Sequence, residues 1–288
     1  MKRNYNAYRG MTKIELLVVL GILVILVMLL IPDLDDPGSV ARRRQCSHNL
    51  KQLALGFHVY HDEHGTLPPP SGSIVPEVPD DNDEDEPEVA DENVVASEPT
   101  DWSWRVRILP LIEEQEQFDK FRFDEPWDSE HNLTVAETMP YGYWCPADPR
   151  EFKEINGHQI PLTNYVMITG PNTVCPTDGT VRTLSDITDK KGETLMIVEV
   201  WGESRPAWIE PIDMTLEDLA RGVNSESGMS ISGDHISRRR MKFFDDEYGG
   251  VNVCFADGSV RLLQDENMTG EELQFMAIIN DGKDVDWD

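Results

Sequence analysis

The stretch Gly10-Met11-Thr12-Lys13-Ile14-Glu15, followed by the apolar run 16–31, decides how this chain is organised. The run contains no charged residue, and Gly21 is its only residue that weakens a helix. At about 1.5 Å per residue, a helix over residues 14–31 is about 27 Å long, close to the hydrocarbon thickness of a bilayer. We therefore predict a membrane-spanning helix.

The flanking charges predict the direction of this span. No acidic residue precedes Glu15, whereas four basic residues do: Lys2, Arg3, Arg9 and Lys13. This asymmetry favours a cytoplasmic N-terminus. A cleavable secretory signal, a plain anchor and a buried helix are the alternatives, and none of them explains Glu15. A carboxylate inside an apolar span costs several kcal/mol (about 3) unless it is paired, so Glu15 is a candidate functional residue.

Gly10 and the segment Met11–Leu20 resemble the prepilin signal of type IV pilins and type II secretion pseudopilins. In that family a membrane peptidase cuts after the glycine and methylates the new amino group, the fifth mature residue is glutamate, and a proline ends the span. Gly10, Glu15 and Pro32 stand at those positions, whereas Met11 replaces the usual Phe. The resemblance implies that Glu15 pairs with the Met11 ammonium of a neighbouring subunit in a fibre.

Composition narrows the classes of partner. The 288 residues carry a net charge of −29, which argues against binding to nucleic acid. Twelve acidic residues lie between Glu77 and Asp101, where there is no Lys or Arg. We predict a disordered acidic insertion over 70–100. An acidic surface favours cationic partners or calcium, although a solvated insertion is the simpler interpretation.

The chain has four cysteines, Cys46, Cys145, Cys175 and Cys254. An even number outside the cytoplasm permits two disulfides, with three possible connectivities. No Cys-x-x-Cys spacing occurs, so the cysteines themselves give little support for a zinc or redox site. Buried free thiols are the alternative.

Residues after the span predict a second helix. Pro37-Gly38 should break the first helix, and a new one should run from Val40 to about His61. Its apolar residues recur at helical spacing and predict a buried stripe of Leu50, Leu53, Ala54, Phe57 and Tyr60. The histidines at 58, 61 and 64 favour packing or capping over metal binding.

The remainder predicts mixed helix and strand. We expect a helix over 109–121, strands over 164–169 and 194–200, and a helix over 270–279 capped by Thr269. Strands 251–256 and 259–263 flank Asp257-Gly258, a strong signal for a tight hairpin. The predicted fold is α+β, with a mainly antiparallel sheet packed on the helix that follows the membrane.

Further blocks resemble bacterial prepilin-type proteins with a large pilin-like domain of unknown function, and this resemblance covers nearly the whole chain. The blocks include Gln45–Leu53, Cys145–Pro149 and Thr194–Glu199. The C-terminal motif of these proteins is His, nine residues, then Asp-Gly. Here Asp257-Gly258 is present, but Glu247 stands at the histidine position by spacing, so no role is carried over for it.

The same resemblance implies a disulfide pairing. Cys46 and Cys145 lie within family blocks, whereas Cys175 and Cys254 lie where the family often has other residues. We therefore predict the bonds Cys46–Cys145 and Cys175–Cys254.

Five segments follow from this interpretation: a prepilin leader at 1–10, a transmembrane and assembly helix at 11–32, a broken second half of the pilin-like helix at 33–69, the acidic insertion at 70–100, and an extracytoplasmic α+β domain at 101–288. The expected location is a single-pass inner-membrane protein with a cytoplasmic N-terminus, followed by a periplasmic or extracellular fibre.

The expected function is that of a pilin-like subunit, cut after Gly10 by prepilin peptidase and assembled with other pilin-like subunits into a pilus or pseudopilus. The alternative is a membrane-anchored binding or adhesin protein that does not polymerise. No Gly-x-Ser-x-Gly, His-Glu-x-x-His or phosphate-binding glycine loop occurs, so we predict no enzymatic activity. We expect no cofactor, with calcium as the one candidate.

Overall fold

The structure is a computed structural model that describes residues 12–30, 37–72, 101–225, 228–233, 235, 237–241, 244–248, 250–264 and 268–283. The chain divides into two compact units, Met1–Pro37 and Gly38–Asp288. The predicted leader 1–10 lies outside the described residues, as does the predicted acidic insertion from residue 73 to residue 100.

In the first unit the structure describes the helix α1 (Lys13–Leu30). Its large apolar side chains are exposed over most of the described length, from Ile14 at 75% to Leu26 at 51%. Within the part of the chain that the structure describes, no helix meets the combined length and hydropathy of a membrane span. The membrane-spanning role of this segment therefore stays a prediction.

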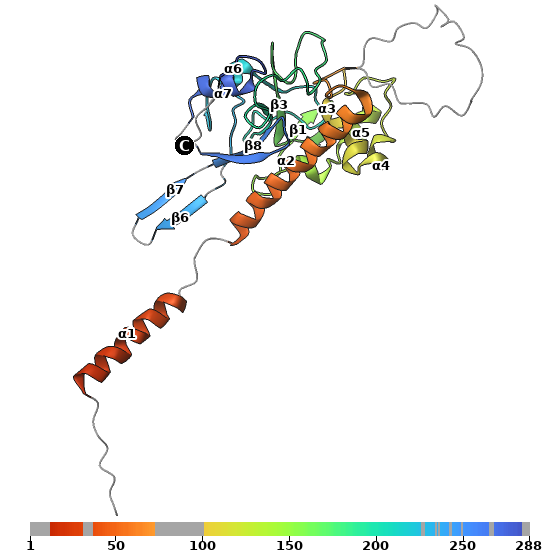
Figure 1. Cartoon of the computed structure of the whole chain (residues 1–288). Coiled ribbons are helices and arrows are strands. Elements are labelled where there is room, and N and C mark those ends of the chain that lie inside the picture. Colours follow the sequence, from red (N-terminus) through yellow and green to blue (C-terminus); the bar gives the residue numbers. More distant parts are fainter. Residues whose placement is uncertain are drawn as a thin grey trace, which may run out of the picture. The chain divides into compact units, whose positions relative to one another are not determined.

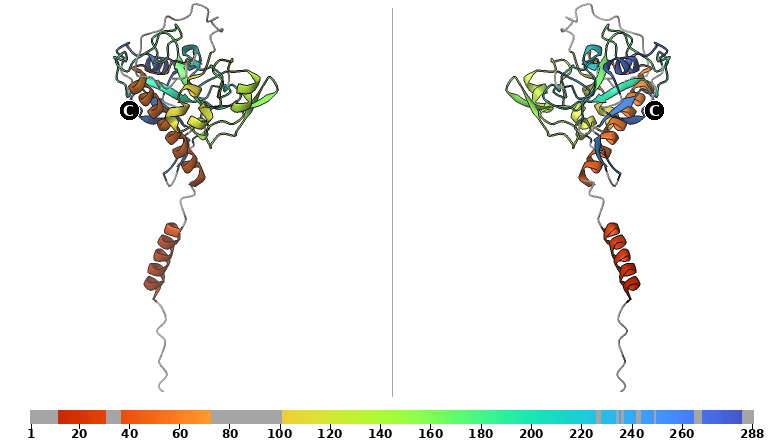
Figure 2. Two further views of the ribbon diagram at one scale, coloured as in Figure 1. Left: turned by 90° about the vertical axis from the view of Figure 1, so that its right-hand side faces the viewer. Right: turned by 90° about the vertical axis from the view of Figure 1, so that its left-hand side faces the viewer.

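The second unit begins with the long helix α2 (Pro37–His64), a single continuous rod in Figures 1 and 2. It begins at the predicted breaker Pro37, because the first position of a helix needs no backbone N–H donor. The predicted stripe is confirmed, since all five of its residues are buried, and Cys46 and Asn49 extend it by about one turn.

A five-stranded sheet forms the centre of the second unit, in the order β5-β3-β4-β8-β9. The strands are β3 (Tyr165–Thr169), β4 (Leu195–Glu199), β5 (Met214–Thr215), β8 (Gly250–Phe255) and β9 (Val260–Gln264). All neighbours are antiparallel except β3 and β5, which are parallel. The predicted mainly antiparallel α+β fold is confirmed for this unit.

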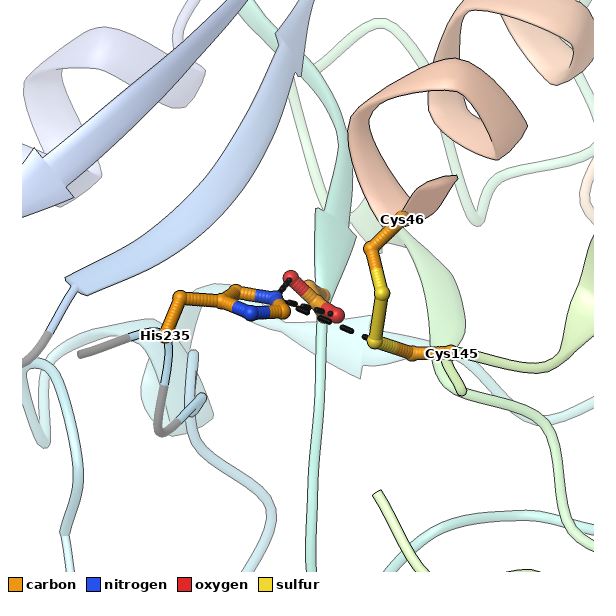
Figure 3. Close-up of side chains that lie close together, drawn as sticks. Cys46, Cys145 and His235 are labelled. Atoms are coloured by element: carbon orange, nitrogen blue, oxygen red, sulfur yellow. Dashed lines mark hydrogen bonds and ion pairs between the residues drawn. A yellow bond between two sulfur atoms is a disulfide. The ribbon is translucent and has the colours of Figure 1, made fainter. Parts of the chain in front are cut away.

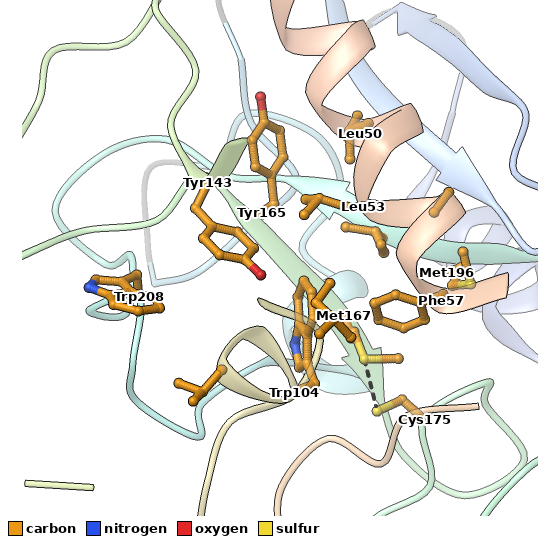
Figure 4. Packing of buried hydrophobic residues seen from close by; sticks show 14 of the residues in the cluster. Leu50, Leu53, Phe57, Trp104, Tyr143, Tyr165, Met167, Cys175, Met196 and Trp208 are labelled. Atoms are coloured by element: carbon orange, nitrogen blue, oxygen red, sulfur yellow. Dashed lines mark hydrogen bonds between the residues drawn. The ribbon is translucent and has the colours of Figure 1, made fainter. Parts of the chain in front are cut away.

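The sheet is buried on both faces, because successive side chains of a strand point to opposite sides. Tyr165 and Met167 of β3 belong to the core cluster that contains the stripe of α2, as Figure 4 shows for Leu50, Leu53 and Phe57. Val166 and Ile168 belong to a second cluster. That cluster includes residues of α6 (Leu216–Leu219) and α7 (Gly270–Ala277).

Short elements complete the unit. The helices are α3 (Trp104–Arg107), η1 (Leu109–Ile112), α4 (Gln115–Phe118), α5 (Glu130–Ala136) and η2 (Tyr141–Tyr143). Two antiparallel pairs of strands are separate from the main sheet. β1 (Phe152–Ile155) pairs with β2 (His158–Pro161), and β6 (Ser237–Met241) pairs with β7 (Phe244–Tyr248).

Most local predictions are confirmed. β8 and β9 form the expected hairpin, and Gly258 adopts a φ of 80° that glycine reaches without strain. Thr269 caps α7 and exchanges reciprocal hydrogen bonds with Glu272. The single helix predicted over 109–121 is wrong. Glu113 takes a left-handed conformation with φ 68° and separates η1 from α4.

A buried ion pair joins α3 to the sheet. The guanidinium of Arg105 lies 2.6 Å from the carboxylate of Asp213, and both side chains are buried. Arg105 also donates to the backbone oxygen of Tyr165, and Asp213 accepts from the backbone N–H of Met167 at 2.9 Å. Burial raises the pKa of Asp213, and the Arg105 guanidinium acts in the opposite direction.

We expect Asp213→Ala to lower the free energy of unfolding by about 3–5 kcal/mol, because it leaves the Arg105 charge buried and unpaired. Denaturant unfolding of the full chain in detergent measures this loss. Glu116→Ala is the matched control, since its ion pair with Lys120 is exposed, and should leave the midpoint unchanged. Equal effects of the two substitutions would contradict the argument.

Candidate functional site

Glu15 is the only predicted processing or assembly residue that the structure describes, because Gly10, Met11 and Pro32 lie outside the described ranges. The backbone N–H of Thr12 donates to Glu15 Oε2 at 2.8 Å. The backbone N–H of Glu15 donates in return to Thr12 Oγ1 at 3.3 Å. This reciprocal cap holds the carboxylate at the amino-terminal end of α1.

The rest of α1 offers an apolar surface with no polar face. Consecutive residues such as Leu17, Val18, Val19 and Leu20 are each about half exposed or more, and consecutive residues of a helix point in different directions. A helix that is apolar all round is one that lipid or other helices must cover. Glu15 is the only acidic residue in α1.

In the second unit, a disulfide attaches α2 to the segment that follows η2. Cys46 and Cys145 are bonded, which confirms this predicted pair across a sequence separation of 99. The backbone N–H of Cys145 donates to Asn164 Oδ1 at 2.9 Å, which fixes the far end of the bond to the start of β3. Both cysteines are fully buried.

The second predicted bond, Cys175–Cys254, is wrong, because both residues are free thiols. The Cys175 thiol instead contacts Met167 Sδ at 3.3 Å, as Figure 4 shows, and Cys254 Sγ lies 3.5 Å from the Phe255 carbonyl oxygen. Burial raises the pKa of both thiols. They therefore act as small apolar core residues and not as reactive groups.

Glu199 and His235 form a buried pair. His235 lies beside the disulfide, as Figure 3 shows. His235 Nε2 lies 2.8 Å from Glu199 Oε2 and 3.8 Å from Cys145 Sγ. Glu199 at the end of β4 is 0% exposed, and His235 is 2% exposed. Two charged or polar groups are thus placed against a disulfide with no access to solvent.

Glu199 is also held by other donors. Both the backbone N–H and the side-chain amide of Asn252 donate to Glu199 Oε2 at 3.2 Å, and the indole N–H of Trp201 donates to Oε1 at 3.3 Å. These hydrogen bonds hold the Glu199 carboxylate in one orientation. His235 Nδ1 has no hydrogen-bond partner among the described residues, although it is buried.

Sequence reasoning missed His235, and a hairpin explains why. The motif spacing points to Glu247, which lies in β7 and pairs in register with Arg238 of β6. Residues 236–256 separate His235 from Asp257, which is 21 residues; omitting the hairpin 237–248 removes 12 and leaves the nine of the motif. We therefore interpret His235 as the histidine of the motif and β6–β7 as an insertion.

The backbone supports this correction. The N–H of His235 donates to the carbonyl oxygen of Gly250 at 3.2 Å, so the chain returns to the same place after the hairpin. The signal in the sequence is the change from three consecutive arginines to Asp-Asp-Glu between His235 and Gly250, which is typical of a hairpin with charged strands.

A long helix packed against a mainly antiparallel sheet, with an apolar helix before it that has a glutamate in its first turn, is the arrangement that the sequence predicts for a pilin-like protein. A family model described as "Protein of unknown function (DUF1559)" matches residues 39–269, and the chain belongs to this family. The match includes both cysteines of the disulfide, Glu199 and His235.

The chain is also similar to the Competence protein ComGC of Halalkalibacterium halodurans. The two are 31% identical over 68 residues, which cover 24% of this chain and 67% of that protein. No solved structure matches the chain significantly.

We expect His235→Leu to lower the free energy of unfolding by about 3 kcal/mol, because it leaves the Glu199 charge buried without its imidazole partner. Urea unfolding of the oxidised full chain in detergent measures the change. The double variant Glu199→Leu/His235→Leu removes the stranded charge and should recover most of the loss. A double variant that is as unstable as the sum of two independent losses would contradict a coupled pair.

Proposed function

We propose that this protein is a pilin-like structural subunit that prepilin peptidase cuts after Gly10 and that polymerises through α1 into a pilus or pseudopilus. The observation that carries the proposal is α1 itself, which exposes apolar side chains between Ile14 and Leu23 and at Leu26 and holds a single carboxylate, Glu15, in its first turn. Membership of the DUF1559 family and the similarity to ComGC support the same class.

The chemistry of assembly follows from the position of Glu15. Cleavage between Gly10 and Met11 would give Met11 a free ammonium group, one residue before the Thr12 cap. In a bundle of apolar helices, an ammonium of one subunit and a carboxylate of the next attract each other strongly, because the dielectric constant is low. An unpaired Glu15 in that setting is costly, so the pair also sets the register between neighbours.

This proposal implies partners and a location. The basic flank with Lys2, Arg3 and Arg9 keeps the leader in the cytoplasm, where prepilin peptidase would act at the inner membrane. The second unit would then lie outside the cytoplasm, in which a disulfide such as Cys46–Cys145 persists. Other pilin-like subunits would cover the apolar surface of α1.

We expect the Glu15→Leu variant to be cut after Gly10 like the wild type, but to be absent from sheared extracellular or periplasmic fibre material. Mass spectrometry of the mature N-terminus, from membranes and from the sheared fraction, measures processing and assembly together. A methylated Met11 in the wild-type sheared fraction is the expected result.

The control is Glu116→Leu, which removes an exposed acid of the second unit and should assemble normally. An intact Met1 on the wild-type protein would overturn the proposal in favour of a membrane-anchored binding protein. Normal recovery of Glu15→Leu in the sheared fraction would overturn the role of the Glu15–ammonium pair.

A further inference from the structure

The buried cluster in the second unit contains a carboxylate and an imidazole that a structural disulfide does not need. Cys46, Cys145, Glu199 and His235 each offer one ligand atom, and these four atoms lie within 4.8 Å of one another. Two hydrophobic residues of similar size would fill the places of Glu199 and His235 without the cost of burying an ionic pair. The presence of both groups beside two cysteines therefore points to a second state of the cluster.

We propose that the cluster is a redox-gated metal site, in which the reduced protein binds one Zn²⁺ through Cys46, Cys145, Glu199 and His235. In the oxidised structure the two sulfurs are bonded to each other and the site is closed to metal. When the bond opens, two thiolates, one imidazole and one carboxylate converge on one point.

The donor types select the metal. Zinc takes thiolate, imidazole and carboxylate ligands in a tetrahedron, whereas calcium and magnesium require oxygen ligands, of which this cluster supplies only those of Glu199. With zinc–sulfur bonds of about 2.3 Å and zinc–nitrogen bonds of about 2.0 Å, two ligand atoms lie about 3.5 Å apart. His235 Nε2 and Cys145 Sγ are already 3.8 Å apart. To bind zinc, the sulfur atoms of Cys46 and Cys145 must move apart. This requires both side chains to rotate, since the two Cα atoms are only 5.1 Å apart.

The surroundings resemble the outer shell of a metal site. Asn252 and Trp201 hold the carboxylate of Glu199 through three hydrogen bonds. Such partners orient a metal ligand before the metal arrives. Three of the four donors are held by the fold: Cys46 by α2, Glu199 by β4, and Cys145 by the hydrogen bond of its backbone N–H to Asn164.

The reaction balances as two steps. A dithiol reductant transfers two electrons and two protons to the Cys46–Cys145 bond, giving two thiols, while the reductant itself becomes a disulfide. Zn²⁺ then binds as the two thiols release two protons. Oxidation by a disulfide reverses both steps and releases the metal.

Cobalt is the probe that tests this site. The full chain is unfolded and reduced with a phosphine, then refolded in detergent without oxygen and with one equivalent of Co²⁺. We expect the ligand-field bands of tetrahedral cobalt together with thiolate-to-cobalt charge-transfer absorption, and their loss when Zn²⁺ is added. The same protein refolded with its disulfide intact should show neither feature. Absence of the bands from the reduced, folded chain would overturn the proposal.

Variants assign the ligands. His235→Ala and Cys46→Ser should each weaken Co²⁺ binding by at least about tenfold, which corresponds to about 1.4 kcal/mol. Cys254→Ser is the matched control, because Cys254 is an equally buried cysteine outside the cluster, and its bands should match the wild type. Bands that survive in His235→Ala or disappear in Cys254→Ser would overturn the assignment.

A measurement on the wild-type sequence covers the case in which a ligand variant does not fold. Reduced protein is treated with an alkylating reagent in the presence and absence of Zn²⁺, and the labelled cysteines are mapped by mass spectrometry. We expect Zn²⁺ to slow the labelling of Cys46 and Cys145 at least about tenfold relative to Cys175 and Cys254. Equal slowing of all four would show a general effect on folding and would overturn a site at this cluster.

Discussion

The attachment of α2 to the central sheet is the interaction on which the second unit depends. The stripe of α2 supplies one side of the larger core cluster, and Leu50, Leu53 and Phe57 are all fully buried in it. Each such side chain contributes about 1.5–3 kcal/mol by leaving water. Without α2, one face of β3, β4 and β8 would be exposed, so neither the helix nor the sheet is expected to be stable without the other.

Directional contacts then fix α2 in a single position. The Cys46–Cys145 bond closes a sequence separation of 99, which removes much of the conformational freedom of the unfolded chain. One turn further along, Asn49 donates to the carbonyl oxygen of Trp144 at 2.9 Å. A covalent bond and a buried hydrogen bond thus join neighbouring turns of α2 to neighbouring residues of the same segment, and rotation of the helix would break both.

The local features of this fold could be predicted from the sequence, because their signals lie within a few residues of one another. The stripe of α2, the Asp257-Gly258 hairpin and the Thr269 cap each follow from a short pattern. The helix expected over 109–121 failed at Glu113, where the tertiary structure imposes a left-handed conformation that no propensity indicates.

The buried cluster was predictable only in part. Cys46 and Cys145 could be paired because a family resemblance places both in recognisable blocks, and the structure confirms the bond. Pairing the other two cysteines by elimination failed, because an even number of cysteines does not require every thiol to be oxidised. His235 was hidden by the β6–β7 hairpin, since counting residues along the chain assumes that no insertion interrupts the motif.

The functional residues of the first unit therefore lie close together in the sequence, whereas those of the second unit lie far apart. In the first unit, the apolar run and Glu15 are contiguous in sequence, so an interaction with lipid or with a neighbouring helix needs only α1. In the second unit, Cys46, Cys145, Glu199 and His235 come from four distant parts of the chain and meet only in the folded unit. A substitution at Glu15 should therefore leave the disulfide and its buried pair intact, whereas a substitution at His235 should leave α1 unchanged. Because the compact units are separate, loss of assembly and loss of the buried cluster can be measured independently in one protein.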